Sequence, residues 1–220
     1  MRFLRPALLV FDLDGTLVDT FGDIARAANY GLEQIGRPAV SVETIIPFVG
    51  RGGRNLIIQC VNDPTASETE IDAAFAAWKT YYADHLIDLS RPYPGAEDAL
   101  GALRRRGIRL AVLSNKWHEL TRGILTGLGL SPLLDAVQGQ APDKPMKPDP
   151  TLLFDMMRQF DAVPETTWMV GDGDADIVLA QNAGILSIGV SWGVHPAAGL
   201  KALGADVIIE SLNELPDLFD

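Results

Sequence analysis

Two aspartates, Asp12 and Asp14, directly follow the apolar run of residues 7–11. A short continuous apolar run is typical of a strand that is buried on both faces of a parallel sheet. In an extended segment, residues two apart point the same way, and Gly15 permits a sharp turn just beyond them. Carboxylates at the carboxyl end of such a strand lie where open α/β sheets bind their ligands. The alternative is that both are solvated turn residues ahead of the next helix.

The stretch Asp12-Leu-Asp14-Gly15-Thr16 resembles the first motif of the haloacid dehalogenase superfamily. For its phosphatases, the resemblance implies that Asp12 is the nucleophile and Asp14 the general acid/base. A carboxylate can attack a phosphoryl group and split hydrolysis into two steps, and a neighbouring acid can protonate the leaving alkoxide. Cleavage of a carbon–halogen bond leaves no alkoxide to protonate, so Asp14 favours phosphoryl transfer over dehalogenation.

A second polar segment, Ser114-Asn115-Lys116, follows the strand expected over residues 108–113 and resembles the second motif of the superfamily. A hydroxyl and backbone amides ahead of a helix form a phosphate-binding corner. The resemblance therefore implies that Ser114 and Asn115, together with Thr16, hold phosphoryl oxygens. The alternative for Ser114 is a simple helix cap. Lys116 could also face the substrate, although the sequence does not require it.

Lys147 lies in a proline-rich loop, Lys147-Pro-Asp-Pro, directly before the helix expected over residues 152–160. It matches the superfamily's third motif, whose lysine neutralises the nucleophile and the phosphoryl oxygens. Lys144, which is also followed by proline, is the rival residue. We prefer Lys147 because its segment directly precedes the helix, as it does in the family.

Asp172 and Asp176 follow the strand expected over residues 166–170 and fit the superfamily's fourth motif. Their hard oxygen ligands suit Mg²⁺. The resemblance implies that Asp12, the Asp14 backbone carbonyl and Asp172 bind the metal, with Asp176 in its outer shell. The charge count also favours a cation, because four carboxylates at one sheet edge need neutralisation. The nearby Asp174 is expected to be an exposed residue at a helix start.

Residues 19–91 change from the strand pattern to helical periodicity and predict a helical cap, as in one branch of the superfamily. Such a cap would exclude water and select the substrate. Its aromatic residues at helical spacing indicate cap core rather than a ligand platform. The glycine-rich loop of residues 49–55 offers Arg51 or Arg54 to a substrate carboxylate and resembles the cap loop of phosphoglycolate phosphatases. A plain turn with solvated arginines is the alternative.

The sequence therefore predicts an α/β fold with a doubly wound parallel sheet and an inserted helical domain. We expect a core domain of residues 1–18 and 92–220, and a cap domain of residues 19–91. The 220-residue chain can bury one good core with an appendage, and 47% of its residues are hydrophobic.

The net charge of −11 disfavours nucleic acid and anionic membrane surfaces as partners. The single cysteine, Cys60, suits a reducing compartment and lies in an apolar helical stretch that predicts a packing role. No signal-peptide pattern or membrane-length apolar run is present in the sequence, so we expect a cytoplasmic protein, as a monomer or homodimer.

These features predict a magnesium-dependent phosphatase that acts on a small phosphorylated metabolite through an aspartyl-phosphate. The resemblance of the glycine-rich loop points to 2-phosphoglycolate. Three alternatives stay open: a phosphatase for a sugar phosphate or nucleotide, a phosphoglucomutase-type isomerase that retains a bisphosphate, and a non-catalytic binding protein. Intact acids at positions 12 and 14 argue against the last alternative.

Overall fold

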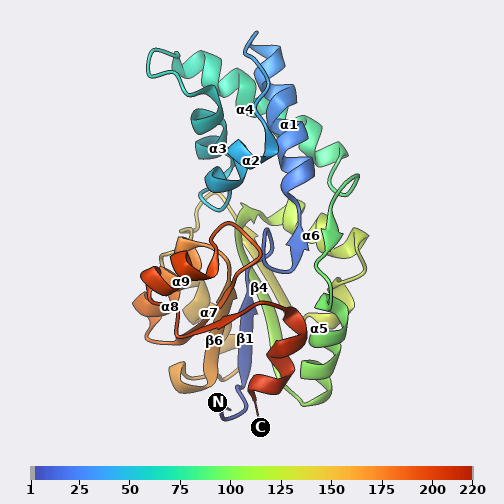
Figure 1. Cartoon of the computed structure of the whole chain (residues 1–220), viewed down its shortest axis with the longest axis vertical. Coiled ribbons are helices and arrows are strands. Elements are labelled where there is room, and N and C mark those ends of the chain that lie inside the picture. The colour runs from blue at the N-terminus through green and yellow to red at the C-terminus, as the bar shows by residue number, and fades with distance from the viewer. Residues whose placement is uncertain (1–2, 220) are drawn as a thin grey trace.

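The computed structural model describes residues 3–219, which are built around a six-stranded parallel sheet in the order β5-β4-β1-β6-β7-β8 (Figure 1). The strands are β1 (Leu8–Phe11), β4 (Arg109–Trp117), β5 (Ala136–Gln140), β6 (Thr167–Gly171), β7 (Leu186–Val190) and β8 (Val207–Ile209). All four residues of β1 are buried, since this strand lies between β4 and β6 and has helices on both faces. The predicted doubly wound α/β class is confirmed.

The side chains of β1 alternate between two hydrophobic clusters, one on each face of the sheet. Leu9 and Phe11 join a cluster with α5 (Ala96–Arg105) and α6 (His118–Gly127). Leu8 and Val10 join a second cluster with α7 (Thr151–Gln159) and α8 (Asp174–Ala183). The remaining elements of this part are α9 (Ala197–Leu203) and the 3₁₀ helices Ser131–Leu133, Pro164–Thr166 and Leu212–Leu218. Helices on both faces thus hold β1 rigidly beneath the site.

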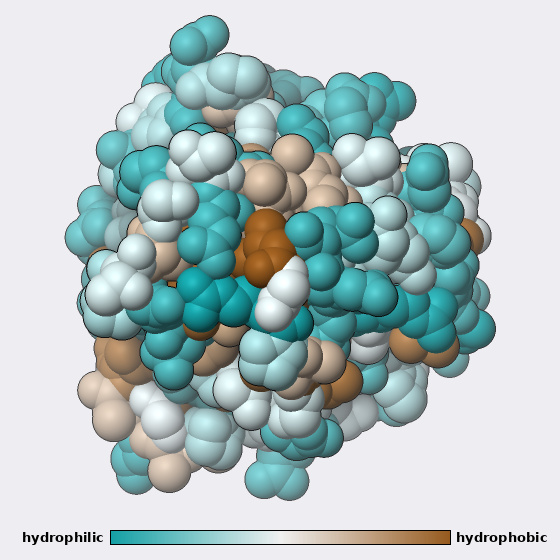
Figure 2. Space-filling view, turned by 90° about the horizontal axis from the view of Figure 1, so that it is seen from above, coloured by the Kyte–Doolittle hydropathy of each residue, from teal (hydrophilic) through white to brown (hydrophobic). Residues whose placement is uncertain are grey.

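Four helices lie beyond the carboxyl ends of the strands, at the top of Figure 1, and are called the cap helices below. They are α1 (Phe21–Gln34), α2 (Val42–Ile45), α3 (Gly53–Val61) and α4 (Glu68–Asp84), with a 3₁₀ turn at Ile46–Phe48. Their apolar faces pack on one another, and Trp78 and Tyr82 of α4 are buried in this packing, although Trp78 also lines the pocket described below. Seen from above, their outer surface is mainly hydrophilic with a small hydrophobic patch (Figure 2).

The chain enters and leaves the cap helices through a two-stranded antiparallel ribbon, β2 (Val18–Asp19) and β3 (Arg91–Pro92). The buried carboxylate of Asp23 secures the returning strand. It accepts hydrogen bonds from the backbone N–H groups of Leu89 and Ser90, and the Ser90 hydroxyl donates to it over 2.7 Å. The ribbon lies at the predicted boundaries of the cap domain, whose independence as a unit stays a prediction.

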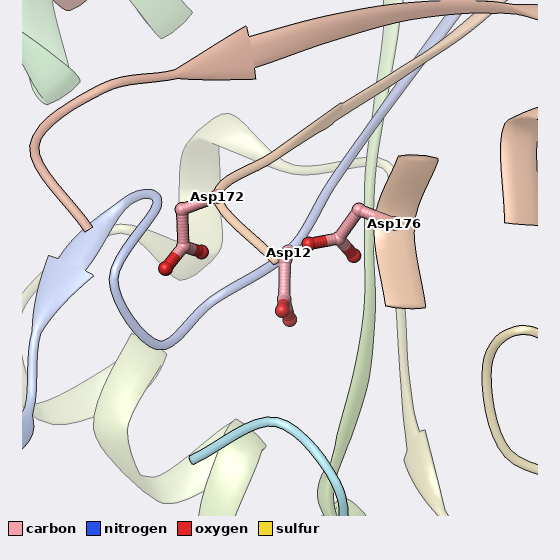
Figure 3. A group of neighbouring side chains, drawn as sticks. All are labelled: Asp12, Asp172 and Asp176. Carbon is pink, nitrogen blue, oxygen red and sulfur yellow. The ribbon is translucent and has the colours of Figure 1, made fainter. Parts of the chain in front are cut away.

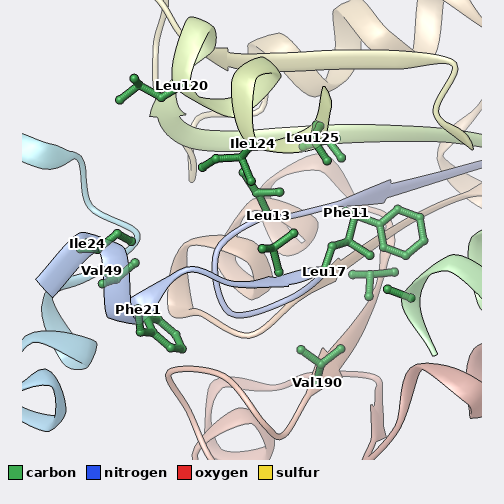
Figure 4. Close-up of a cluster of buried hydrophobic side chains, with 14 of the residues drawn as sticks. Phe11, Leu13, Leu17, Phe21, Ile24, Val49, Leu120, Ile124, Leu125 and Val190 are labelled. Carbon is green, nitrogen blue, oxygen red and sulfur yellow. The ribbon is translucent and has the colours of Figure 1, made fainter. Parts of the chain in front are cut away.

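One hydrophobic cluster continues from the sheet into the cap helices (Figure 4). Phe11 and Val190 contribute from the sheet, and Ile24 and Val49 contribute from the cap side. Among residues 3–219, no helix combines the length and hydropathy needed to span a membrane. The shared cluster packs the cap helices against the core at the edge of the sheet where the polar residues gather.

Candidate active site

Three buried carboxylates meet at the carboxyl edge of the sheet (Figure 3). Asp12 follows β1, Asp172 follows β6, and Asp176 lies in the first turn of α8. Since β1 and β6 are paired neighbours, their ends deliver two of the acids to one place. One carboxylate oxygen from each residue lies within 4.8 Å of the others. This oxygen cluster has the ligand chemistry that Mg²⁺ prefers.

Glycines and hydrogen bonds hold Asp172 in place. A Cβ atom at Gly15, whose φ is +79°, would lie 2.2 Å from Asp172 Oδ2, and a Cβ at Gly193 would lie equally close. The Thr16 hydroxyl donates to Asp172 Oδ1 over 2.7 Å, and the Val194 N–H donates to Oδ2 over 2.7 Å. A side chain at either position would collide with the Asp172 carboxylate, so the turn after β1 requires Gly15 and the loop after β7 requires Gly193.

Burial makes the negative charge of this cluster costly. It raises the pKa of Asp172 to about 8, and the carboxylates of Asp176 and Asp12 add to that rise. Burial also raises the pKa of Asp12 to about 6, against the opposing effect of the Lys147 ammonium. The protein alone thus leaves the cluster short of positive charge, which is the condition that a bound cation relieves.

Lys147 supplies positive charge directly at the cluster. Its ammonium lies 2.9 Å from Asp12 Oδ2 and 2.7 Å from Asp176 Oδ1, and its side chain is 1% exposed. Burial alone would lower the pKa of Lys147, but the two carboxylates raise it above the usual value. Lys144, the rival residue, is exposed and donates to Gln138 instead. Lys147 is thus the lysine that reaches the acidic cluster.

Asn115 positions Lys147 with its side-chain amide. Its Oδ1 accepts from the Lys147 N–H over 2.8 Å, and its Nδ2 donates to the Lys147 and Gly50 carbonyls. The side chains of Asn115 and Thr16 were both expected on phosphoryl oxygens, but in this structure their hydrogen bonds are to protein atoms. Ser114 is buried beside them and lines the cavity described below. The Ser114 hydroxyl oxygen accepts a hydrogen bond from the Lys116 N–H over 3.3 Å, and its contact with a phosphoryl oxygen stays a prediction.

The side chain of Asp14 contacts different residues from those that contact Asp12. Its Oδ1 accepts from the Thr20 hydroxyl over 2.6 Å, and its Oδ2 lies 2.9 Å from the Lys116 ammonium. That ammonium lies 4.7 Å from the centre of the Tyr82 ring. The Asp14 side chain is therefore outside the three-carboxylate cluster, and the role of its backbone carbonyl at a metal stays a prediction.

A pocket lies between these residues and the cap helices. Asp12, Asp14 and Lys116 line its polar side. Its opposite side is apolar or backbone and comes mainly from the cap: Ile24, Val49, Gly50, Gly52, Gly53, Leu56 and Trp78. The nucleophile and acid/base expected from the sequence thus line the same pocket.

The two loop arginines have different surroundings from those expected for a substrate-binding pair. Arg54 is engaged by Glu68 and Asp72 within the cap helices, so the expectation that it is free for a substrate is wrong. Arg51 pairs with Asp174 at the start of α8, and its side chain is 64% exposed. Asp174 is thus more than an exposed helix-start residue. The assignment of Arg51 to a substrate carboxylate stays a prediction.

Sequence reasoning left the position of Lys116 open and did not place Thr20 in the site. Thr20 precedes α1, and its hydroxyl donates to Asp14 instead of capping the helix. Lys116 lies near the end of β4, which continues to Trp117 because β5 still pairs there, beyond the expected end at residue 113. The available signal was the place of Lys116 in the second polar segment, beside Ser114 and Asn115. Cys60, by contrast, is buried with its pKa raised to about 11 and has the predicted packing role.

The parallel sheet, the aspartates at its strand ends and the buried lysine define a class of hydrolases. Residues 9–190 match the model of the haloacid dehalogenase-like hydrolases, and the chain belongs to this family. The resemblance read from the four motifs is therefore confirmed.

Several relatives cover nearly the whole chain. A phosphoglycolate phosphatase of Cupriavidus necator is 37% identical over 96% of this chain and 91% of its own length. One from Agrobacterium fabrum is 34% identical over 100% of this chain and 94% of its own length. Among solved structures, a predicted phosphoglycolate phosphatase from Haemophilus somnus has a TM-score of 0.90 at 28% identity, covering 96% of this chain and 97% of that one. The cap helices are included in this likeness.

Proposed function

We propose that this chain is a magnesium-dependent phosphatase that hydrolyses 2-phosphoglycolate through an aspartyl-phosphate on Asp12. The observation that carries the proposal is the placement of Asp12. It lies beside the buried Lys147 ammonium and two further carboxylates, and it lines the pocket under the cap helices. The phosphoglycolate phosphatases that match nearly the full length of the chain support the choice of substrate.

In the first half of the reaction, a carboxylate oxygen of Asp12 attacks phosphorus, and the bond from phosphorus to the ester oxygen breaks. Asp14 gives its proton to the departing oxygen. In the second half, water attacks the phosphorus on Asp12 and passes a proton to Asp14, and the bond from phosphorus to Asp12 breaks. Lys147 holds Asp12 in position and offsets negative charge on the phosphoryl oxygens. Ser114 is placed to donate to one of those oxygens.

The described residues fit a divalent cation. When all are ionised, the four site carboxylates (Asp12, Asp14, Asp172 and Asp176) outnumber the two buried lysines (Lys116 and Lys147) by two charges. Asp12, Asp172 and the Asp14 backbone carbonyl would hold Mg²⁺, with Asp176 fixing the outer shell. When bound, the cation neutralises the carboxylates and polarises the phosphoryl oxygens.

We further propose that residues 19–91 act as a cap domain that excludes water from the reacting groups. The Asn115 hydrogen bond to the Gly50 carbonyl and the Arg51–Asp174 ion pair both join the cap side to the core. A site covered by the cap contains less bulk water, which strengthens its electrostatic interactions.

The test is phosphate release from 2-phosphoglycolate, measured with Mg²⁺ and with a chelator. We expect Asp12→Asn to lower kcat by a factor on the order of 10³ or more, since it removes the nucleophile. Asp98→Asn, a change of the same kind at an exposed position of α5, is the matched control and keeps full activity. Release that survives Asp12→Asn, or that needs no divalent cation, would contradict the proposal. Release that requires an added bisphosphate would favour the mutase.

A further inference from the structure

We propose that Lys116 is the residue that recognises the carboxylate of the substrate, and that this carboxylate replaces Asp14 as its ionic partner. The inference rests on the proposed function and names the specificity determinant within that site. It differs from the sequence-based expectation, which gives this role to Arg51.

Lys116 is the cation of the substrate cavity. Within the described part of the chain, the residues that line this cavity include Asp12 and Asp14 but no other lysine or arginine. The side chain of Lys116 is 5% exposed, and its ammonium lies 2.9 Å from Asp14 Oδ2. An ammonium group has three N–H donors, so one carboxylate oxygen does not exhaust it. A second anion in the cavity would find a buried donor here.

The other nearby cations are less suited to the role. Lys147 is already shared between Asp12 and Asp176, at the reacting end of the site. Arg51 lines a neighbouring pocket that also reaches Asp12 and Asp14, but its guanidinium is paired with Asp174 and its side chain is 64% exposed. An ion pair in water contributes little to binding, whereas a buried charge-assisted hydrogen bond contributes more. Burial therefore favours Lys116 as the discriminating group.

The position of Lys116 favours a short substrate. Asp12 and Asp14 are two residues apart, so their Cα atoms are separated by at most about 7 Å. The Lys116 ammonium contacts Asp14, and all three residues line one pocket. The site is suited to short phosphorylated carboxylic acids, and a two-carbon acid belongs to this class.

The exchange of partners also affects Asp14. When the substrate carboxylate takes the Lys116 ammonium, Asp14 keeps its hydrogen bond from Thr20 and loses its ionic partner. Its carboxyl group is then free to turn toward the leaving oxygen. A substrate without the carboxylate would leave the Lys116–Asp14 ion pair intact. Part of the binding energy of the carboxylate would therefore appear as a higher kcat for the substrate that carries it.

The test compares 2-phosphoglycolate with ethyl phosphate, in which a methyl group replaces the carboxylate. We expect Lys116→Met to lower the ratio of the two kcat/KM values by roughly 10- to 100-fold, the worth of a charged hydrogen bond. Lys116→Arg should recover part of this ratio because it keeps the charge. Lys79→Met is the matched control: Lys79 lies over the Trp117 ring outside this cavity, and its loss should leave the ratio unchanged.

Two results would overturn the inference alone. In one, Lys116→Met slows both substrates equally, which is the result expected if Lys116 only supports Asp14. In the other, Arg51→Met lowers the ratio and Lys116→Met does not. Wild-type enzyme that hydrolyses ethyl phosphate as well as 2-phosphoglycolate would instead refute the proposed substrate, and the inference with it. Loss of both activities in Asp12→Asn would still identify a phosphatase.

A second comparison covers the case in which Lys116→Met does not fold. The double variant Asp14→Asn/Lys116→Met removes both members of the buried ion pair, which costs less than leaving one unpaired. The measurement is the ratio of the Kd values for 3-phosphonopropionate and propylphosphonate. This ratio is determined for the double variant and for Asp14→Asn alone. We expect the preference for the carboxylate to be lost only in the double variant, and equal preferences in the two proteins would refute the role of Lys116.

Discussion

Replacement of Lys147 by methionine removes the charge that joins Asp12 to Asp176. The side chain is almost completely buried, and its ammonium lies 2.9 Å and 2.7 Å from the two carboxylates. Methionine keeps most of the length of the side chain, so the main change is electrostatic. Two buried carboxylates then lose their shared partner in a cluster that already carries excess negative charge.

The expected loss of stability is large. Removal of one member of a buried ion pair costs roughly 3–5 kcal/mol, because the other charge stays buried without a partner. In a chain of this length, 1 kcal/mol changes Tm by about 2–4 °C. We therefore expect Lys147→Met to lower Tm by about 6–20 °C in the absence of divalent cations. The same variant should lower kcat by roughly 100-fold or more, since Lys147 also offsets charge on the phosphoryl oxygens.

Thermal unfolding in a chelator, followed by the phosphate-release assay with Mg²⁺, measures both effects. Lys144→Met is the matched control, since Lys144 lies three residues away in the same loop and is exposed. It should leave Tm within about 2 °C of wild type, as is usual for surface substitutions. A Lys147→Met protein with wild-type Tm, or a larger effect from Lys144→Met, would refute the reasoning.

Two further predictions concern Asp172 and Asp23. The pKa of Asp172 rises from 3.8 in the unfolded chain to about 8 in the folded, metal-free protein. Between these pH values the folded protein keeps a proton that the unfolded chain has lost, so the free energy of unfolding falls as the pH rises. Thermal unfolding in a chelator from pH 5 to 8 should therefore show a steeper fall for wild type than for Asp172→Asn, and Mg²⁺ should flatten it; equal slopes would contradict this. Asp23→Ala should lower the free energy of unfolding by about 2–4 kcal/mol, because it leaves the buried N–H groups of Leu89 and Ser90 without their acceptor. Denaturant unfolding against Asp84→Ala, a change of the same kind in an exposed residue of α4, measures this loss, and equal midpoints would disprove it.

The sequence by itself determined the sheet and the acids at its edge. Buried parallel strands appear as short apolar runs, so the position of Asp12 after β1 and of Asp172 after β6 follows from local pattern. The carboxyl ends of parallel strands meet at one edge, which brings residues 160 positions apart into one cluster. The cap helices were also predictable from their periodicity, since Ile24, Ala28 and Leu32 repeat at helical spacing along α1.

Only the tertiary structure decided which partners each polar side chain has. Local pattern shows that a lysine follows a strand, but the pairing of Lys116 with Asp14 depends on how β4 lies beside β1 and on the Tyr82 ring from α4. Arg51 and Arg54 are equivalent in the sequence, three residues apart in one loop, yet one pairs with α8 and the other with α4. Their hydrogen-bond partners come from distant segments, and the packing of those segments is settled by the whole fold. Local propensity therefore locates the reacting acids, while long-range packing assigns the charges that surround them.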